Sequence, residues 1–137
     1  MMMRTAATLI SLAANLVQAA DLSVTITGIR EPEGHLLVAV VDSATAWDEQ
    51  GEPVARRRVP ADGERISLEI PDLPAGDYAI QVAHDENDNG GLDFNLLGIP
   101  TEGYGFSNNP DVRRRPTFDE ARFTLGADGA SIVVELR

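Results

Sequence analysis

The residues best suited to chemistry lie in one polar stretch, residues 84–93, which read HDENDNGGLD. Counted from Asp85 as position 1, oxygen-bearing side chains fall at positions 1, 3, 5 and 9, and a glycine falls at position 6. Alternate residues point their oxygens into one hollow, while glycine adopts the positive φ that turns the chain. Oxygen ligands without cysteine favour calcium over zinc or copper. The spacing therefore predicts a structural calcium site, formed by the side chains of Asp85, Asn87, Asn89 and Asp93 and the carbonyl of Gly91.

The calcium pattern is incomplete at its end. Position 12, which usually supplies a bidentate acid, is Leu96. The last ligand would then be Glu102, Asn95 or Asp88. A solvated turn is the alternative interpretation, because Asn, Asp and Gly are also ordinary turn formers.

The same region offers weaker evidence for catalysis. An acid follows His84, and Ser107 lies in the same polar region, but no Gly-x-Ser-x-Gly motif marks a nucleophile. We therefore expect no enzymatic activity. The alternative is a carbohydrate-active or hydrolytic enzyme that uses His84 and the neighbouring acids.

A second candidate binding segment, residues 102–109, reads EGYGFSNN. Tyr104 and Phe106 present flat apolar faces that can stack on a sugar ring, and Glu102 and Asn108 add polar groups. These four residues are candidate ligand contacts. The alternative is that both rings fold inward and cover the loop.

The basic residues form two clusters, Arg56-Arg57-Arg58 and Arg113-Arg114-Arg115. Arginine binds phosphate with two parallel hydrogen bonds, so these triplets could contact a phosphate-bearing lipid or polysaccharide. Pairing with the surplus acids is the alternative. The single tryptophan, Trp47, is either an anchor for a partner or a cap on the core.

Short alternating segments separated by turns must position these groups. Residues 22–27 alternate strictly between apolar and polar, and residues 36–41 form the nearly continuous apolar run of a central strand. Further strands are expected at residues 54–59 on a sheet edge, at 66–70 and 78–83, and in a terminal hairpin of residues 121–125 and 131–136. Tyr78 follows a chain corner, where its hydroxyl either bonds back to the backbone or the ring merely packs.

About seven strands without a helix longer than one turn indicate an all-β fold, an antiparallel β-sandwich. Residues 84–117 hold no plausible strand longer than four residues. A long loop of that kind in a small domain is usually functional. We therefore expect the function to lie there.

Composition and the N-terminal segment indicate export. The 137 residues include no cysteine and carry a net charge of −11, which argues against nucleic-acid binding. Arg4 precedes an uncharged, mostly apolar run, and Val17 and Ala19 suit a signal-peptidase site. We expect a signal peptide at residues 1–19, a single domain at residues 20–137, no membrane span after cleavage, and a periplasmic or secreted location.

Three blocks of the sequence, LPAGDY (73–78), HDEN (84–87) and EGYGFSNN (102–109), resemble the bacterial exported domain family of unknown function 2141, DUF2141. The resemblance covers essentially the whole chain after the expected signal peptide. It implies a small exported sandwich of the Ig-like or transthyretin-like type. It implies no established activity and brings no catalytic residues.

Together these features predict an exported, non-enzymatic binding or structural module of the cell envelope. Its working surface would be residues 84–109, stabilised by calcium, and its partner a cell-envelope glycan or protein. A further alternative is an accessory domain whose role depends on a neighbouring gene product.

Overall fold

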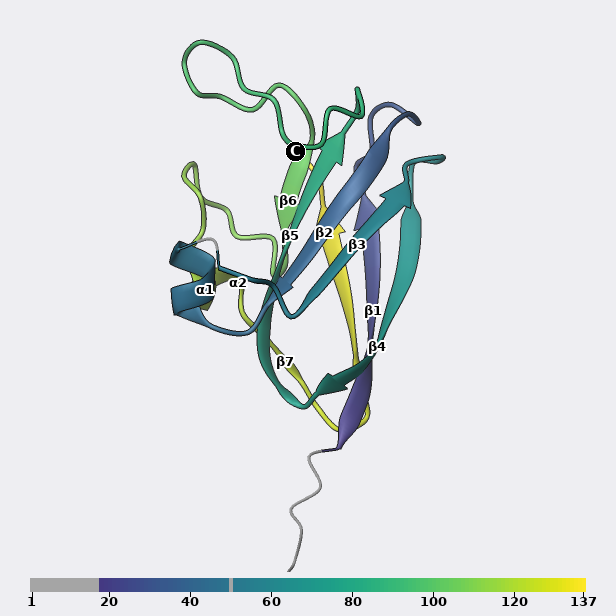
Figure 1. Ribbon diagram of the computed structural model, residues 1–137, viewed down its shortest axis with the longest axis vertical. Helices are drawn as coiled ribbons and strands as arrows, with labels where there is room; N and C mark the ends of the chain where they lie inside the picture. The colour runs from purple at the N-terminus through teal and green to yellow at the C-terminus, as the bar shows by residue number, and fades with distance from the viewer. Residues whose placement is uncertain (1–17, 50) are drawn as a thin grey trace, which may run out of the picture.

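The computed structural model describes residues 18–49 and 51–137 (Figure 1). The expected signal peptide falls almost entirely on residues 1–17, which lie outside the described residues. Within the described ranges the elements are β1 (Ala19–Thr27), β2 (His35–Val41), α1 (Ala44–Asp48), β3 (Ala55–Pro60), β4 (Ile66–Pro74), β5 (Gly76–Asp85), β6 (Tyr104–Phe106), α2 (Phe118–Ala121), β7 (Phe123–Leu125) and β8 (Ala130–Glu135).

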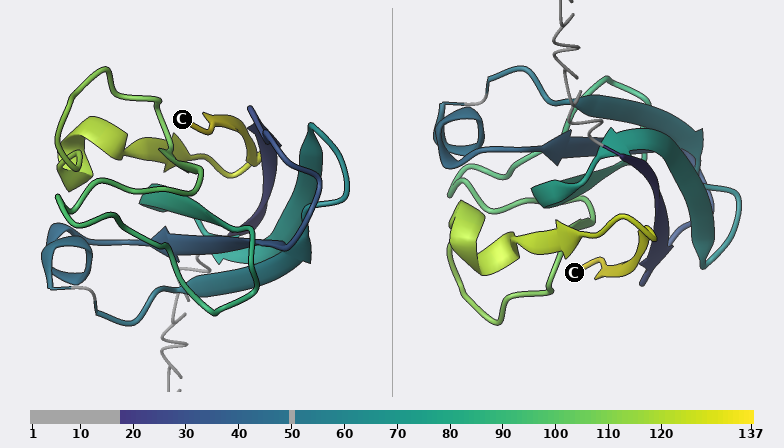
Figure 2. Two further views of the ribbon diagram at one scale, coloured as in Figure 1. Left: turned by 90° about the horizontal axis from the view of Figure 1, so that it is seen from above. Right: turned by 90° about the horizontal axis from the view of Figure 1, so that it is seen from below.

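These strands form two sheets, which makes the protein an all-β sandwich as predicted. One sheet has the strand order β4-β1-β8, and the other has the order β3-β2-β5-β6, with β7 also paired to β5. Figures 1 and 2 show α1 and α2 together on one side of the molecule. In the part of the chain that the structure describes, no helix is long and apolar enough to cross a membrane.

Side chains that alternate along the strands fill the space between the sheets. Leu22, Val24 and Ile26 of β1 are fully buried, as are Leu36 and Val40 of β2. Burial of each such side chain contributes about 1.5–3 kcal/mol to folding. The alternation in residues 22–27 therefore predicted β1 and its buried face correctly, and the apolar run of residues 36–41 predicted β2.

The last two strands pair differently from the expected terminal hairpin, so that prediction is wrong. β7 lies antiparallel to β5, with Tyr78 opposite Phe123, whereas β8 lies parallel to β1, with Leu22 opposite Ala130. The turn between them carries the chain from one sheet to the other. The physical reason is that β8 covers the free edge of β1 and places Val134 in the core, where it is fully buried.

Of the two interpretations of Tyr78 at the corner before β5, the structure shows the hydrogen bond back to the backbone. The hydroxyl of Tyr78 donates to the carbonyl of Pro74, the last residue of β4. Burial raises the pKa of Tyr78, with a further contribution from the negative charge of Asp42. The Tyr78 hydroxyl therefore stays neutral, and its hydrogen bond links the end of β4 to the start of β5.

Candidate functional site

The outer face of the five-stranded sheet carries two rows of side chains that run across β3, β2, β5 and β6. Residues paired across neighbouring strands point to the same face of a sheet. The upper row is Arg58, Leu37, Ala83 and Tyr104, and the lower row is Arg56, Ala39, Gln81 and Phe106. Each row therefore starts with an arginine at the edge strand and ends with an aromatic ring.

A groove of about 990 Å³ lies over these two rows. Small side chains such as Ala39 and Ala83 lower its floor, and residues 90–100 form one wall. Arg113, Arg114 and Arg115 line it from the other side. The structure thus brings arginines of both triplets to one groove, although the triplets lie far apart in the sequence. Arg57 lies opposite the buried Val38, so its side chain points to the other face of the sheet.

Trp47 closes the lower end of the groove and is itself buried. Its indole N–H donates to the carbonyl of Pro116 over 2.9 Å, and its ring meets the rings of Phe106 and Phe118 edge to face. Of the two interpretations of this tryptophan, the structure shows the cap on a core, because only 1% of its surface is exposed. A smaller cavity of about 210 Å³ extends from the groove along Trp47.

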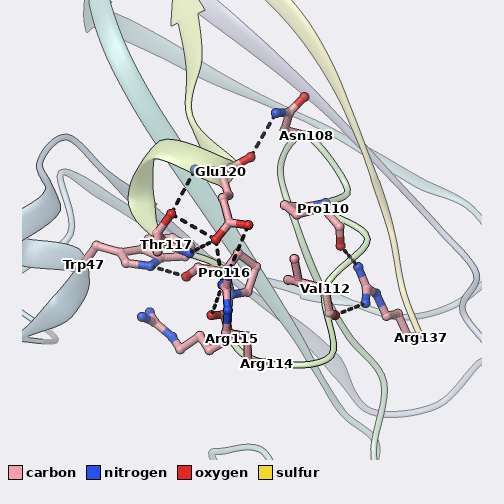
Figure 3. A network of polar contacts seen from close by, with 10 residues as sticks. All are labelled: Trp47, Asn108, Pro110, Val112, Arg114, Arg115, Pro116, Thr117, Glu120 and Arg137. Carbon is pink, nitrogen blue, oxygen red and sulfur yellow. Dashed lines mark hydrogen bonds and ion pairs between the residues drawn. The ribbon is translucent and has the colours of Figure 1, made fainter.

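Arginine and glutamate side chains hold the lower wall, residues 107–117, in place (Figure 3). Arg115 lies over the Trp47 ring, 4.4 Å from its centroid, and donates to Gln81 on the groove floor over 3.0 Å. Arg114 pairs with Glu120 over 2.6 Å. Of the second triplet, Arg114 therefore pairs with an acid, whereas Arg115 bonds to an amide.

Glu120 joins this wall to the start of α2. Its carboxylate accepts from the backbone of Thr117, while the Thr117 hydroxyl accepts from the backbone of Glu120, which forms a capping box. The Arg114 guanidinium, followed by the bond from the Thr117 backbone, lowers the pKa of Glu120 from 4.5 to about 2. The wall is therefore most firmly held when Glu120 is ionised.

At the upper end, Asp85 organises the start of the predicted calcium loop. Its carboxylate is fully buried and accepts from the backbone N–H groups of Asn89 and Gly90, over 3.0 and 2.8 Å. Gly90 has a φ of +93°, the positive value expected at position 6. Asp85 thus shapes the turn.

The other predicted calcium side chains do converge. The amide of Asn87 donates to one oxygen of Asp93 over 2.7 Å, and the amide of Asn89 donates to the other. These two bonds lower the pKa of Asp93, the one from Asn89 most. The N–H of Gly91 donates to the side-chain oxygen of Asn89 over 3.2 Å.

These contacts occur without a cluster of ionisable metal ligands. Among the described residues, no group of three or more His, Cys, Asp or Glu side chains is placed to hold a metal ion. The loop oxygens instead accept hydrogen bonds from backbone and amide groups. Calcium binding therefore stays a prediction.

Glu102 closes the base of the 86–103 loop. One carboxylate oxygen accepts from the N–H of Glu86 over 2.7 Å, and the other from the N–H of Asp93 over 2.9 Å. Its surface is only 5% exposed. The residue that we considered as a ligand contact is thus a clamp that joins the two ends of the loop.

The three other candidate ligand residues lie in different surroundings. Tyr104 and Phe106 both line the groove, although Phe106 also packs against Trp47. Asn108 donates to the carbonyl of Glu120 over 2.9 Å and stabilises the lower wall. The structure therefore brings the two rings, but not Asn108, to the groove.

His84 and Ser107, the candidate base and nucleophile, are both buried. His84 is 1% exposed; its Nε2 donates to the carbonyl of Glu33 over 2.7 Å, and its Nδ1 lies 3.6 Å from Glu86. Ser107 is fully buried and donates to the carbonyl of Ala121 over 2.6 Å. Each group is bonded within the protein interior.

Sequence reasoning missed two features of this site. The first is the groove, which depends on the pairing of β3 with β2. Its only signal in the sequence was Arg56 and Arg58, two arginines at alternate positions of the expected edge strand. The second is an apolar tip on the loop, where Leu96 and Leu97 are almost fully exposed. A pair of leucines inside a polar stretch was the available signal.

The fold and the groove define a small β-sandwich with a cationic groove on the outer face of one sheet. A family model described as "Uncharacterized protein conserved in bacteria (DUF2141)" matches residues 24–133 of the chain. The protein belongs to this family. Neither the comparison with curated proteins nor the comparison with solved structures gives a match.

Proposed function

We propose that the protein is an exported, non-enzymatic binding module of the cell envelope, and that its groove holds an anionic ligand such as an acidic glycan. One observation carries the proposal: arginines of both triplets, Arg56 and Arg58 on the sheet and residues 113–115 on the wall, line one groove in a chain whose net charge is −11. Cations clustered at one place on an acidic chain raise the local concentration of anionic ligands there.

The distribution of groups in the groove fits such a ligand. Arg56 is highly exposed and lies 3.8 Å from the still more exposed Glu52, so solvent screens that pair. Arg58 lies 3.4 Å from Asp88. Across the floor, the ring of Tyr104 offers an apolar face. A sugar acid could bond to the arginines with its carboxylate and stack its ring on the aromatic side.

The proposal includes a calcium ion that stiffens the upper wall. The side chains of three predicted ligands, Asn87, Asn89 and Asp93, already lie within hydrogen-bond distance of one another. A half-turn of an Asn amide exchanges its nitrogen for its oxygen, so Asn87 and Asn89 can present oxygens toward Asp93. Residues 85–93 would hold the ion, and the ion would supply the charge that the clustered oxygens lack.

Burial of His84 supports the non-enzymatic part of the proposal, since a general base must reach its substrate. Export is proposed from the sequence of residues 1–19 alone. The periplasm or the external medium is then where the ligand would be found.

Titration calorimetry with tetragalacturonate, and with neutral maltotetraose as the control sugar, tests the groove. We expect heat of binding with the acidic sugar only, and a loss of about tenfold or more in affinity for Arg56→Gln/Arg58→Gln. The matched control is Arg65→Gln/Arg122→Gln, which removes the same charge elsewhere. Equal affinity of both double variants would contradict the assignment of the groove.

A further inference from the structure

Residues 94–100 form the tip of the 86–103 loop, and this tip is apolar and ordered by its own contacts. Phe94 and Pro100 pair as a β-bridge at its neck. The side-chain oxygen of Asn95 accepts from the N–H groups of Leu97 and Ile99, over 2.9 and 3.0 Å. The N–H of Asn95 donates to the carbonyl of Ile99 over 2.9 Å. The turn is therefore held by its own hydrogen bonds.

This turn presents large apolar side chains to the outside. The exposed fractions are 57% for Phe94, 106% for Leu96, 84% for Leu97 and 55% for Ile99. Four large apolar side chains so close together form an exposed patch, which in a stable protein usually marks an interaction surface. A tip held in shape by Asn95 exposes them in the folded state.

The tip lies on the cationic side of the molecule. Phe94, Gly98 and Pro100 line the same groove as arginines of both triplets. In Figure 1 the loop that carries the tip projects to the same side as α1 and α2. Phe94 of the tip therefore lies beside the groove arginines, while the chain as a whole is acidic.

We propose that the tip and the groove arginines together dock on an anionic lipid surface. Leu96 and Leu97 enter the boundary between headgroups and acyl chains, and arginines of the groove bind headgroup phosphates. This inference rests on the proposed function, because it names the phosphate of a lipid headgroup as the anion in the groove.

The two contacts support each other physically. The strength of the apolar contact grows with the apolar area of the tip that is buried in the lipid. Cations next to the tip add electrostatic attraction to anionic lipids. Guanidinium groups bind phosphate through paired hydrogen bonds. The acidic remainder of the protein is repelled by the same surface, so attachment is confined to the side that carries the tip.

Co-sedimentation of the full chain with vesicles tests this inference. One set of vesicles is phosphatidylcholine alone, and the other contains about one third phosphatidylglycerol, a mixture in which anionic headgroups attract basic side chains. We expect binding to the mixed vesicles, weakened about tenfold or more by Leu96→Ser/Leu97→Ser. All variants contain residues 1–17, so a difference in vesicle binding between the unchanged chain and the Leu96→Ser/Leu97→Ser variant reports on the tip alone.

Two further variants complete the design. Val54→Ser/Val133→Ser removes two other exposed apolar side chains and should bind like the unchanged chain. Arg56→Gln/Arg58→Gln should lose the preference for phosphatidylglycerol. Thermal unfolding confirms that each variant is folded before it is compared.

Each outcome decides the inference. Binding to the mixed vesicles that is equally strong with and without both leucines overturns it. Self-association of the chain that disappears with the same change also overturns it, because a second copy then covers the tip. Binding of tetragalacturonate without binding of vesicles overturns the lipid inference and leaves the proposed function intact. Binding of neither tetragalacturonate nor vesicles overturns both.

Discussion

The guanidinium of Arg115 lies over the indole ring of Trp47, 4.4 Å from its centroid. This contact joins the lower wall of the groove to α1. Partial burial of the guanidinium against the ring lowers the pKa of Arg115, while the residue as a whole stays exposed. A cation that is partly desolvated over an aromatic ring contributes more than an exposed one.

A double-mutant cycle tests this contact. Arg115→Met keeps the aliphatic stem and should lower the free energy of unfolding by about 1 kcal/mol. Trp47→Leu should lower it by about 3 kcal/mol, because a fully buried ring and its bond to Pro116 are lost. Urea unfolding of both single variants and the double variant gives the coupling, expected at about 0.5–1.5 kcal/mol. Strict additivity would contradict the contact.

The lower wall should loosen in acid. Because the folded protein lowers the pKa of Glu120 from 4.5 to about 2, ionised Glu120 stabilises the fold above pH 4.5. That stability is lost as the pH falls from about 4.5 through 2. Melting temperatures across this range should fall less steeply for Glu120→Gln than for the unchanged protein, with the exposed Glu64→Gln as control. Parallel curves would contradict the ion pair with Arg114.

The clamp at the base of the 86–103 loop depends on both oxygens of Glu102. Glu102→Gln keeps one acceptor oxygen and leaves one backbone N–H without its partner. We expect a loss of about 1–3 kcal/mol in the free energy of unfolding. Hydrogen exchange should accelerate at the amides of Glu86 and Asp93. Unchanged exchange at both amides would show that the loop is held by other contacts.

Calcium should stabilise the fold if residues 85–93 bind it. With a dissociation constant of about 10⁻⁴–10⁻³ M, 10 mM calcium would add about 1.4–2.7 kcal/mol. The melting temperature should then rise by several degrees over the value in chelator, and Asp93→Asn should reduce the rise. Magnesium at equal concentration controls for ionic strength. A rise below about 1 °C would count against the site.

Local pattern in the sequence determined several features of this protein. The alternation in residues 22–27 and the nearly continuous apolar run of residues 36–41 predicted two strands of the core. A short edge strand was predicted at residues 54–59, where the structure has β3. The corner before Tyr78 was recognisable because its chemistry is contained in a few consecutive residues. Period-two burial is a local property, so a single segment reveals it.

Only the tertiary structure decided which segments meet. β7 and β8 are consecutive in the chain but join different sheets, because each pairs with the edge that lets its apolar face reach the core. The same long-range pairing buries His84, turns Glu102 into a clamp and brings Arg56 and Arg115 to one groove. Contacts between distant residues depend on the packing of the whole sandwich, and no short stretch of sequence contains that information.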